Sequence, residues 1–80
     1  MGDEAEVLDA RGLKCPLPVL KAEKRLTAMT AGQRLVVLAT DPMAKVDIPL
    51  FCRRHGYACA EERNGDLLKF TIIKSAAPAP

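Results

Sequence analysis

Hydrophobic residues along the chain switch between strand-like and helix-like spacing, and these switches divide it into six elements. A short apolar, β-branched run at 6–9 predicts an opening strand. From Cys15 to Met29, apolar residues recur every three or four positions, which predicts an amphipathic helix of about 14 residues. We expect this helix to end near Ala31 and Gly32, because glycine readily adopts the left-handed conformation that follows a helix.

The middle of the chain predicts a second strand and a second helix. Residues 34–40 are apolar at both parities, which is typical of a central strand with both faces covered. We expect the helix to begin with Asp47 as its N-cap, after an irregular turn at 43–46, because Pro49 then lies in the first turn. Gly56 is the expected C-terminal glycine. Residues at helical spacing form the apolar face: Ile48, Phe51, Cys52 and His55.

The last third predicts a β-hairpin, with strands near 57–63 and 66–74 joined by Asn64-Gly65. A two-residue turn there predicts the following opposed pairs: Arg63 with Asp66, Glu61 with Leu68, Cys59 with Phe70, and Tyr57 with Ile72. The aromatic and aliphatic members of these pairs share the face that we expect to pack on the core. The tail at 75–80 is rich in Ala and Pro, and we expect it to be disordered.

The element order strand, helix, strand, helix, strand, strand predicts an α/β (α+β) two-layer sandwich. We expect a βαβαββ domain over residues 1–74, in which two helices pack on one face of a four-stranded mixed sheet. A right-handed crossover makes the first two strands parallel, so their carboxyl ends meet at one edge of the sheet. Cys15 and Asp41 follow these two strands and are therefore predicted to be neighbours.

Cys15 lies in the sequence GLKCPLP, between the first strand and the first helix. If it is the N-cap, Pro16 and Pro18 lie in the first turn. The N–H of Leu17 is then free to point at the sulfur. A helix N-terminus carries unpaired N–H groups and a partial positive charge, which together with Lys14 would stabilise a thiolate. The alternative is a helix start that carries a small buried thiol.

Asp41 has two compatible interpretations. It caps the following turn, or it orients a partner group or manages a proton beside Cys15. A carboxylate near the sulfur raises the pKa of the thiol, which opposes the effects of the helix end and of Lys14.

The other two thiols are predicted to pack in the core. Cys59 falls on the core face of the hairpin and Cys52 on the apolar face of the second helix, and free cysteine is among the most buried residue types. A zinc site from Cys52, His55 and Cys59 would need Cys15, at a distant helix end, as its fourth ligand. A nucleophilic pair of Cys52 and His55 would lie against the core. We therefore expect no metal and no cofactor.

The 80-residue chain has a net charge of +2 and three cysteines without CxxC spacing. An odd number of cysteines argues against a disulfide framework and favours reduced thiols in a cytoplasm. The sequence contains neither a signal peptide nor a bilayer-spanning stretch. We therefore expect a soluble cytoplasmic protein without membrane contact.

Basic residues gather around Cys15 and along the first helix, against the single acid Glu23. They are Arg11, Lys14, Lys21, Lys24 and Arg25. This pattern fits a rim that binds an acidic protein partner or RNA phosphates. It also fits the ordinary solvated face of a surface helix. No stacking aromatic residues accompany these charges, which gives single-strand nucleic-acid binding little support.

Three motifs occur in a specific order along the chain. LDAxGLxCPxP at 8–18 is followed by TDP at 40–42 and by DIPxFC at 47–52, with Gly56 beyond it. This combination resembles the TusA (SirA-like) family of small sulfur-carrier proteins, and the resemblance covers about residues 7–74.

The resemblance implies a βαβαββ fold and a cysteine that carries sulfane sulfur as a persulfide. By position this cysteine is Cys15. The residues expected to support it are Lys14, Pro16, Leu17, Pro18 and Asp41. Family members take sulfur from a cysteine desulfurase or a rhodanese-like protein and pass it to acceptors such as those of the DsrE/TusD type. They serve tRNA thiolation, molybdenum-cofactor maturation or sulfur oxidation, and Leu17 stands where the tRNA-thiolation branch has an acidic residue.

We therefore expect a sulfurtransferase that acts together with partner proteins. The Cys15 thiolate would attack the outer sulfur of a donor persulfide, with no internal base if the helix end and Lys14 stabilise the thiolate. One alternative is a regulatory or RNA- or protein-binding module, with salt-dependent binding through the basic first helix. A thiol–disulfide oxidoreductase is disfavoured because no resolving cysteine lies near Cys15 in the sequence.

Overall fold

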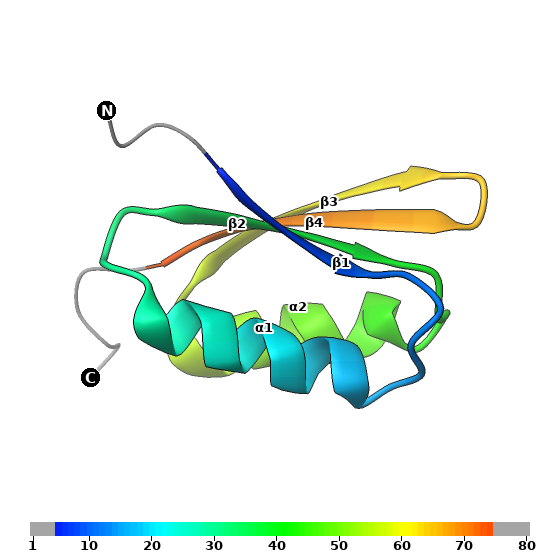
Figure 1. Ribbon diagram of the computed structural model, residues 1–80, viewed down its shortest axis with the longest axis horizontal. Coiled ribbons are helices and arrows are strands. Elements are labelled where there is room, and N and C mark those ends of the chain that lie inside the picture. Colours follow the sequence, from blue (N-terminus) through cyan, green and yellow to red (C-terminus); the bar gives the residue numbers. More distant parts are fainter. Residues whose placement is uncertain (1–4, 75–80) are drawn as a thin grey trace.

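The computed structural model describes residues 5–74, in which a four-stranded mixed sheet is covered on one face by two helices (Figure 1). The elements are β1 (Glu6–Ala10), α1 (Leu17–Ala28), β2 (Arg34–Ala39), α2 (Ala44–His55), β3 (Ala58–Asn64) and β4 (Leu67–Ile73). The strand order across the sheet is β1-β2-β4-β3. The predicted two-layer βαβαββ fold is confirmed. The tail at 75–80, for which the sequence predicts disorder, lies outside the described residues.

Strand β2 is one of the two central strands of the sheet. It pairs in parallel with β1 and antiparallel with β4, so both of its edges are hydrogen-bonded. Leu35, Val37 and Ala39 are fully buried, and Val36 and Leu38 on the opposite face are half-buried. This burial explains why the strand is apolar at both parities. Because β1 and β2 run in the same direction, the loops that follow them leave the sheet at the same end (Figure 1).

The core lies between the sheet and the two helices, and it is built from aliphatic side chains and two aromatic rings. Each helix contributes residues spaced four apart, which places them on one side of the helix. The helix contributions include Ala22 and Leu26 from α1, and Ala44, Ile48 and Cys52 from α2. Phe70 and Ile72 of β4 cover them from the sheet. None of the helices within residues 5–74 is long and apolar enough to cross a membrane.

Helix α1 ends earlier than its pattern predicts. The side chain of Lys74, from the end of β4, donates hydrogen bonds to the carbonyl oxygens of Leu26 (2.6 Å) and Met29 (2.7 Å). The N–H of Met29 also donates to the carbonyl oxygen of Leu26 at 3.1 Å, and the Lys74 ammonium supplies a further donor at this helix end from a distant part of the chain. Gly32 is therefore not the residue that ends the helix, and it lies in the following turn with a φ of 90°.

Helix α2 begins three residues before the expected N-cap, Asp47. The backbone carbonyl of Asp41 accepts a hydrogen bond from the N–H of Ala44 at 3.0 Å, so residues 43–46 belong to the helix and its start rather than to an irregular turn. Pro49 consequently lies inside the helix. Gly56 ends the helix with a φ of 73°, as predicted.

The hairpin turn contains Gly65 and Asp66 rather than Asn64 and Gly65. An Asn-Gly turn of type I′ needs a positive φ at both residues, but only Gly65, at 63°, has one. The predicted pairs are therefore wrong by two residues. Cys59, for example, lies opposite Ile72 instead of Phe70. Because the side-chain period of a strand is two, the same residues still face the core.

Candidate functional site

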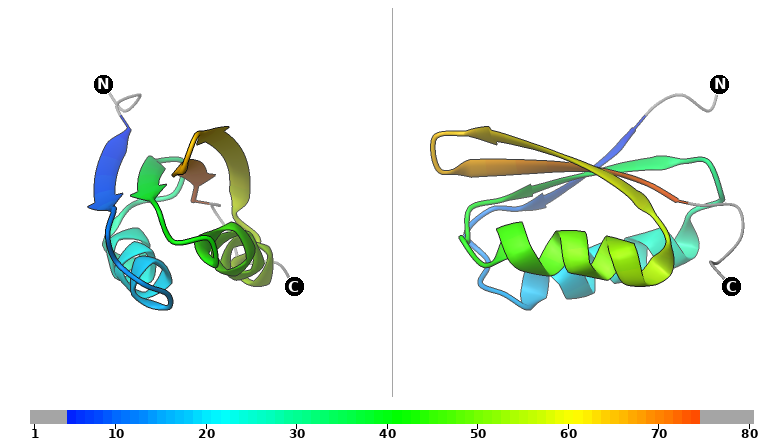
Figure 2. Two further views of the ribbon diagram at one scale, coloured as in Figure 1. Left: turned by 90° about the vertical axis from the view of Figure 1, so that its right-hand side faces the viewer. Right: turned by 180° about the vertical axis from the view of Figure 1, so that it is seen from behind.

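The starts of α1 and α2 lie side by side at the end of the sheet where β1 and β2 finish (Figure 2, left). Cys15 lies in the loop before α1, and Asp41 lies in the loop before α2. The backbone N–H of Cys15 donates a hydrogen bond to the carboxylate Oδ2 of Asp41 at 2.7 Å. The predicted proximity of these residues is confirmed, since the carboxyl ends of adjacent parallel strands meet at one edge.

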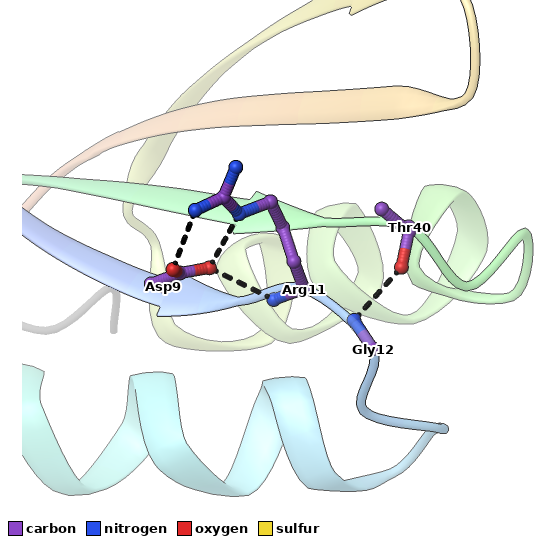
Figure 3. Close-up of polar contacts among 4 residues, drawn as sticks. All are labelled: Asp9, Arg11, Gly12 and Thr40. Carbon is purple, nitrogen blue, oxygen red and sulfur yellow. Dashed lines mark hydrogen bonds and ion pairs between the residues drawn. The ribbon is translucent and has the colours of Figure 1, made fainter.

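Polar contacts hold the β1–α1 loop in place before it reaches Cys15 (Figure 3). The N–H of Gly12 donates to the hydroxyl Oγ1 of Thr40 at 2.9 Å, which ties this loop to the end of β2. The guanidinium of Arg11 donates to both carboxylate oxygens of Asp9, each at 2.8 Å. These bonds lower the pKa of Asp9 to about 2. The positive charge of Arg11 is thus paired with a carboxylate at the end of β1, two residues earlier in the chain.

The carboxylate of Asp41 organises both loops. Its second oxygen, Oδ1, accepts a hydrogen bond from the N–H of Met43 at 3.0 Å, so Asp41 caps the turn that begins α2, as predicted. The hydrogen bonds from Met43 and Cys15, together with the positive charge of Lys14, hold the pKa of Asp41 below its usual value. Asp41 is therefore a fixed acceptor for backbone groups and is poorly suited to taking up a proton.

Cys15 is not the N-cap of α1. Pro16 occupies that position, and the peptide bond between Cys15 and Pro16 is cis. The N–H of Leu17 donates to the carbonyl oxygen of Lys14 at 2.9 Å instead of pointing at the sulfur. Pro18 is buried and anchors the first turn of the helix on the core. The predicted contact between the sulfur and a free helix N–H is therefore wrong.

The Cys15 thiol keeps its proton near neutral pH. Burial, a hydrogen bond to Asp47, and the negative charges of Asp47 and Asp41 raise the pKa of this thiol to about 11. The positive charge of Lys14 lowers the pKa of Asp41 and is not among the causes that shift the pKa of Cys15. The sequence left the net shift of this pKa open, and in the isolated chain desolvation and two carboxylates decide it. The Cys15 side chain is half-buried, so it is neither the fully accessible thiol nor the buried thiol that the sequence allowed.

Asp47 completes the site, and sequence reasoning missed this role by assigning it to an N-cap. Because α2 begins at Ala44, Asp47 lies at the end of its first turn. It lines a groove between the two helices together with Pro16 and Phe51. The spacing of four between Asp47 and Phe51, which places them on the same side of a helix, was the available signal. Asp47 is the carboxylate to which the Cys15 thiol donates.

The basic residues expected to form a rim divide into paired and unpaired groups. Arg25 forms an ion pair with Glu6 of β1, as Arg11 does with Asp9. Lys21 and Lys24 are exposed on α1 and form no ion pair among residues 5–74. The free positive charge of α1 is therefore limited to these two lysines.

Large apolar side chains are exposed near the starts of both helices. They are Leu17 and Leu20 of α1, the N-cap Met43, and Val46 and Leu50 of α2, each 41–54% exposed. We call these five residues the apolar cluster. The groove that contains Asp47 runs between the two helices, with Leu50 on its wall. An exposed apolar patch of this kind is typical of a protein-binding surface. The spacing 43, 46, 50 was a sequence signal for it.

The remaining predicted candidates lie away from Cys15. Cys52 is buried and Cys59 half-buried, so their predicted packing is confirmed. His55 is exposed but lies on the predicted face of α2, where its ring is 4.4 Å from that of Phe51 and stacks on Tyr57 with centroids 5.4 Å apart. No group of three or more His, Cys, Asp or Glu residues within 5–74 is arranged to hold a metal ion.

Comparison with known proteins gives a consistent picture. A family model described as sulfurtransferase TusA matches residues 6–74. The sulfur carrier protein TusA of Allochromatium vinosum is 45% identical over 76 residues, which cover 94% of this chain and 100% of that protein. The sulfur carrier protein TusA of Pseudomonas putida is 42% identical over 57 residues, which cover 71% of each chain.

A solved structure has the same architecture. The crystal structure of the SirA-like protein from Desulfitobacterium hafniense matches with a TM-score of 0.79 and 26% identity, covering 90% of this chain and 99% of that one. Sequence motifs, fold and relatives therefore agree. The chain belongs to the TusA (SirA-like) family of sulfur carrier proteins.

Proposed function

We propose that Cys15 is the sulfur-carrying residue and that it holds sulfane sulfur as a persulfide between a donor and an acceptor protein. The observation that carries this proposal is the double attachment of Cys15. Its backbone N–H is bound by Asp41, and its thiol donates to Asp47. Cys52 and Cys59 lie farther along the chain in the α2–β3 region, where their thiols interact with each other rather than with a carboxylate acceptor.

Sulfur uptake requires the resting thiol to lose its proton. We assign this proton to Asp47, whose carboxylate already accepts the Cys15 S–H hydrogen bond. The sulfur of Cys15 attacks the outer sulfur of a donor cysteine persulfide, so a new S–S bond forms and the donor S–S bond breaks. The donor cysteine leaves as a thiolate and takes up the proton. The proposed step therefore uses an internal base, in contrast to the sequence expectation.

Sulfur delivery reverses these roles. A thiolate of the acceptor protein attacks the outer sulfur of the Cys15 persulfide, and Cys15 leaves as a thiolate that recovers its proton through Asp47. A thiol with a high pKa is a slow leaving group in such exchanges. The pKa of about 11 for Cys15 therefore favours retention of the sulfur until a bound acceptor stabilises the leaving thiolate.

Docking of both partners is assigned to the apolar cluster, with Lys21 and Lys24 of α1 beside it. The cluster lies at the same helix starts as Cys15, so a protein bound there covers the sulfur and excludes water. The lysines favour partners with an acidic rim. Suitable partners are a cysteine desulfurase or rhodanese-like donor and an acceptor of the DsrE/TusD type, all in the cytoplasm, where thiols stay reduced. In these complexes the chain is a sulfurtransferase.

The decisive experiment is sulfur loading followed by mass spectrometry. After incubation with a cysteine desulfurase and cysteine, the wild-type chain should carry one added sulfur on the Cys15 peptide, and a reductant should remove it. Cys15→Ser should take up none. Cys59→Ser, which replaces another half-buried thiol, is the matched control and should load normally. Loading of Cys15→Ser, or no loading of the wild type, would refute the assignment.

The alternative of an RNA-binding module loses support from the same contacts. Arg11 and Arg25 are paired with acidic residues of their own chain, which leaves few phosphate-binding charges on α1. RNA binding that survives Cys15→Ser and weakens steeply with salt would favour it.

A further inference from the structure

Cys52 and Cys59 form a second pair of thiols, which sulfur transfer at Cys15 leaves unused. Cys52 lies on α2 and is only 1% exposed, whereas Cys59 lies on β3 and is half-buried. Both thiols line the same surface hollow, and each shifts the pKa of the other. The N–H of Tyr57 donates to the carbonyl oxygen of Cys52 at 2.8 Å, which folds the chain back so that β3 starts beside the end of α2.

The pair can be reached from outside. An open surface hollow is lined by both cysteines together with Pro49, Arg53 and Tyr57. Cys52 also belongs to the hydrophobic core, against which Cys59 packs from the edge of the sheet. A small reagent in the hollow therefore meets Cys59 first, with Cys52 behind it.

The two thiols differ in electrostatics as well as in exposure. The hydrogen bond from Cys52 lowers the pKa of Cys59, against the opposing effects of burial and of the negative charge of Glu61. The same bond and burial raise the pKa of Cys52. A more accessible thiol with a lowered pKa next to a buried thiol suits thiol–disulfide exchange, because one sulfur attacks the reagent and the other resolves the intermediate.

We propose that Cys52 and Cys59 form a reversible disulfide by exchange with a low-molecular-weight disulfide such as glutathione disulfide. The Cys59 sulfur attacks one sulfur of the reagent, the reagent S–S bond breaks, and one glutathione thiolate leaves. Cys52 then loses its proton and attacks the Cys59 sulfur of the mixed disulfide, which releases the second glutathione. The protein loses two electrons and two protons, and one glutathione disulfide becomes two glutathione thiols.

The position of the bond gives it a defined structural effect. It closes the segment 52–59 and ties the last turns of α2 to the edge strand β3, which otherwise pairs with β4 alone. Asp47 lies on the same helix, on the side of α1. The pair is thus a modification site on the helix that carries part of the sulfur-transfer site, while its chemistry is independent of Cys15.

The test uses the folded Cys15→Ser variant, so that only this pair can react. Incubation with excess glutathione disulfide should lower its mass by two hydrogen atoms, and peptide mapping should find Cys52 linked to Cys59. Dithiothreitol should restore the original mass. If both thiols can still be alkylated after equilibration, the proposal is wrong.

Two double variants separate the roles of the sulfurs. Cys15→Ser with Cys52→Ser should stop at the mixed disulfide, with one glutathione on Cys59. Cys15→Ser with Cys59→Ser should stay unmodified because Cys52 is buried. If glutathione instead attaches to Cys52, or never to Cys59, the proposed order is overturned. Circular dichroism confirms that each variant is folded, and Cys52→Ala replaces Cys52→Ser if the serine is not tolerated.

Discussion

The backbone N–H of Cys15 and the carboxylate of Asp41 are 26 residues apart in the chain and are joined by a hydrogen bond of 2.7 Å. The same carboxylate binds the N–H of Met43 at the start of α2. One side chain therefore positions the Cys15 loop and begins the second helix. Its two oxygens are used by backbone donors, which leaves the Cys15 thiol to a different carboxylate, that of Asp47.

Replacement of Asp41 should disturb both the fold and the position of Cys15. Asp41→Ala leaves the N–H groups of Cys15 and Met43 without their acceptor, and we expect the free energy of unfolding to fall by about 1–2 kcal/mol. Sulfur loading should also slow. Urea denaturation measures the first effect and mass spectrometry the second. Asp41→Asn, which keeps one acceptor oxygen, should be intermediate, and equal stability of all three proteins would contradict this role.

The reactivity of Cys15 should rise with pH well beyond the range of an ordinary thiol. In a chain with Cys52→Ser and Cys59→Ser, the rate of alkylation by iodoacetamide should reach its midpoint near pH 11, because the pKa of Cys15 is raised to about 11 from its usual 9.0. Asp47→Asn should lower this midpoint, since it removes a negative charge that disfavours the thiolate. A midpoint at or below 9.0 in the parent would contradict a raised pKa for Cys15.

Asp47→Asn should separate simple reactivity from sulfur transfer. Near neutral pH the variant should be alkylated faster, because more of its Cys15 is ionised. It should nevertheless take up sulfur from a donor persulfide more slowly, because the proton acceptor is lost. Quenched time courses of alkylation and of sulfur loading, measured on the same preparation, give the two rates. If both rates change in the same direction, Asp47 affects only the pKa of the thiol.

The ion pair of Asp9 and Arg11 should protect the folded chain from acid. The pKa of Asp9 falls to about 2 from its usual 3.8, so the carboxylate contributes stability that is present above pH 3.8. This contribution is lost as the pH falls through about 2. An NMR titration of the Asp9 carboxyl should show the low midpoint, and Arg11→Gln should return it toward 3.8. An unchanged midpoint in Arg11→Gln would exclude the guanidinium as its cause.

Truncation of the buried thiol should reduce stability without affecting sulfur loading. Cys52→Ala removes a side chain that is 1% exposed, and we expect a loss of about 1–2 kcal/mol from the cavity left behind. Cys59→Ala should cost less because Cys59 is only half-buried. Loading of Cys15 should be intact in both. A loading defect in a well-folded Cys52→Ala chain would contradict the assignment of sulfur transfer to Cys15 alone.

The apolar cluster should matter for transfer from a protein donor. Val46 is 54% exposed, so Val46→Asp should fold normally but load sulfur more slowly from a cysteine desulfurase, because a charge is buried on docking. Val7→Asp is the matched control, since Val7 is 60% exposed on β1, on the side of the sheet away from the helices. Equal loss of loading in both variants would argue against a specific docking surface.

The order of elements and their buried faces could be predicted because they depend on local periodicity. Apolar spacing along α1, α2 and β2 sets which side chains meet the core, and the parallel pairing of β1 and β2 brings the loops of Cys15 and Asp41 together. The hairpin faces were correct although the register was wrong by two residues, because a shift of two leaves every side chain on its side.

Helix ends and the hairpin turn depended on partners that the local sequence does not reveal. Lys74 donates to carbonyl oxygens at the end of α1 from the far end of the chain, and α2, which follows the turn capped by Asp41, begins four residues before the proline pattern suggests. The turn takes Gly65 as its first residue because no other residue there has a positive φ. Each of these outcomes is a contact or a conformation that tertiary packing selects among locally acceptable alternatives.

The sequence by itself determined the family, the two-layer fold, and a cysteine at the start of the first helix beside an aspartate. Only the tertiary structure decided the protonation state of Cys15, the role of Asp47, and the pairing of Cys52 with Cys59. The physical reason is that periodicity is a property of neighbours along the chain. The pKa of a thiol instead depends on desolvation and on charges that separate elements bring within a few ångströms of it.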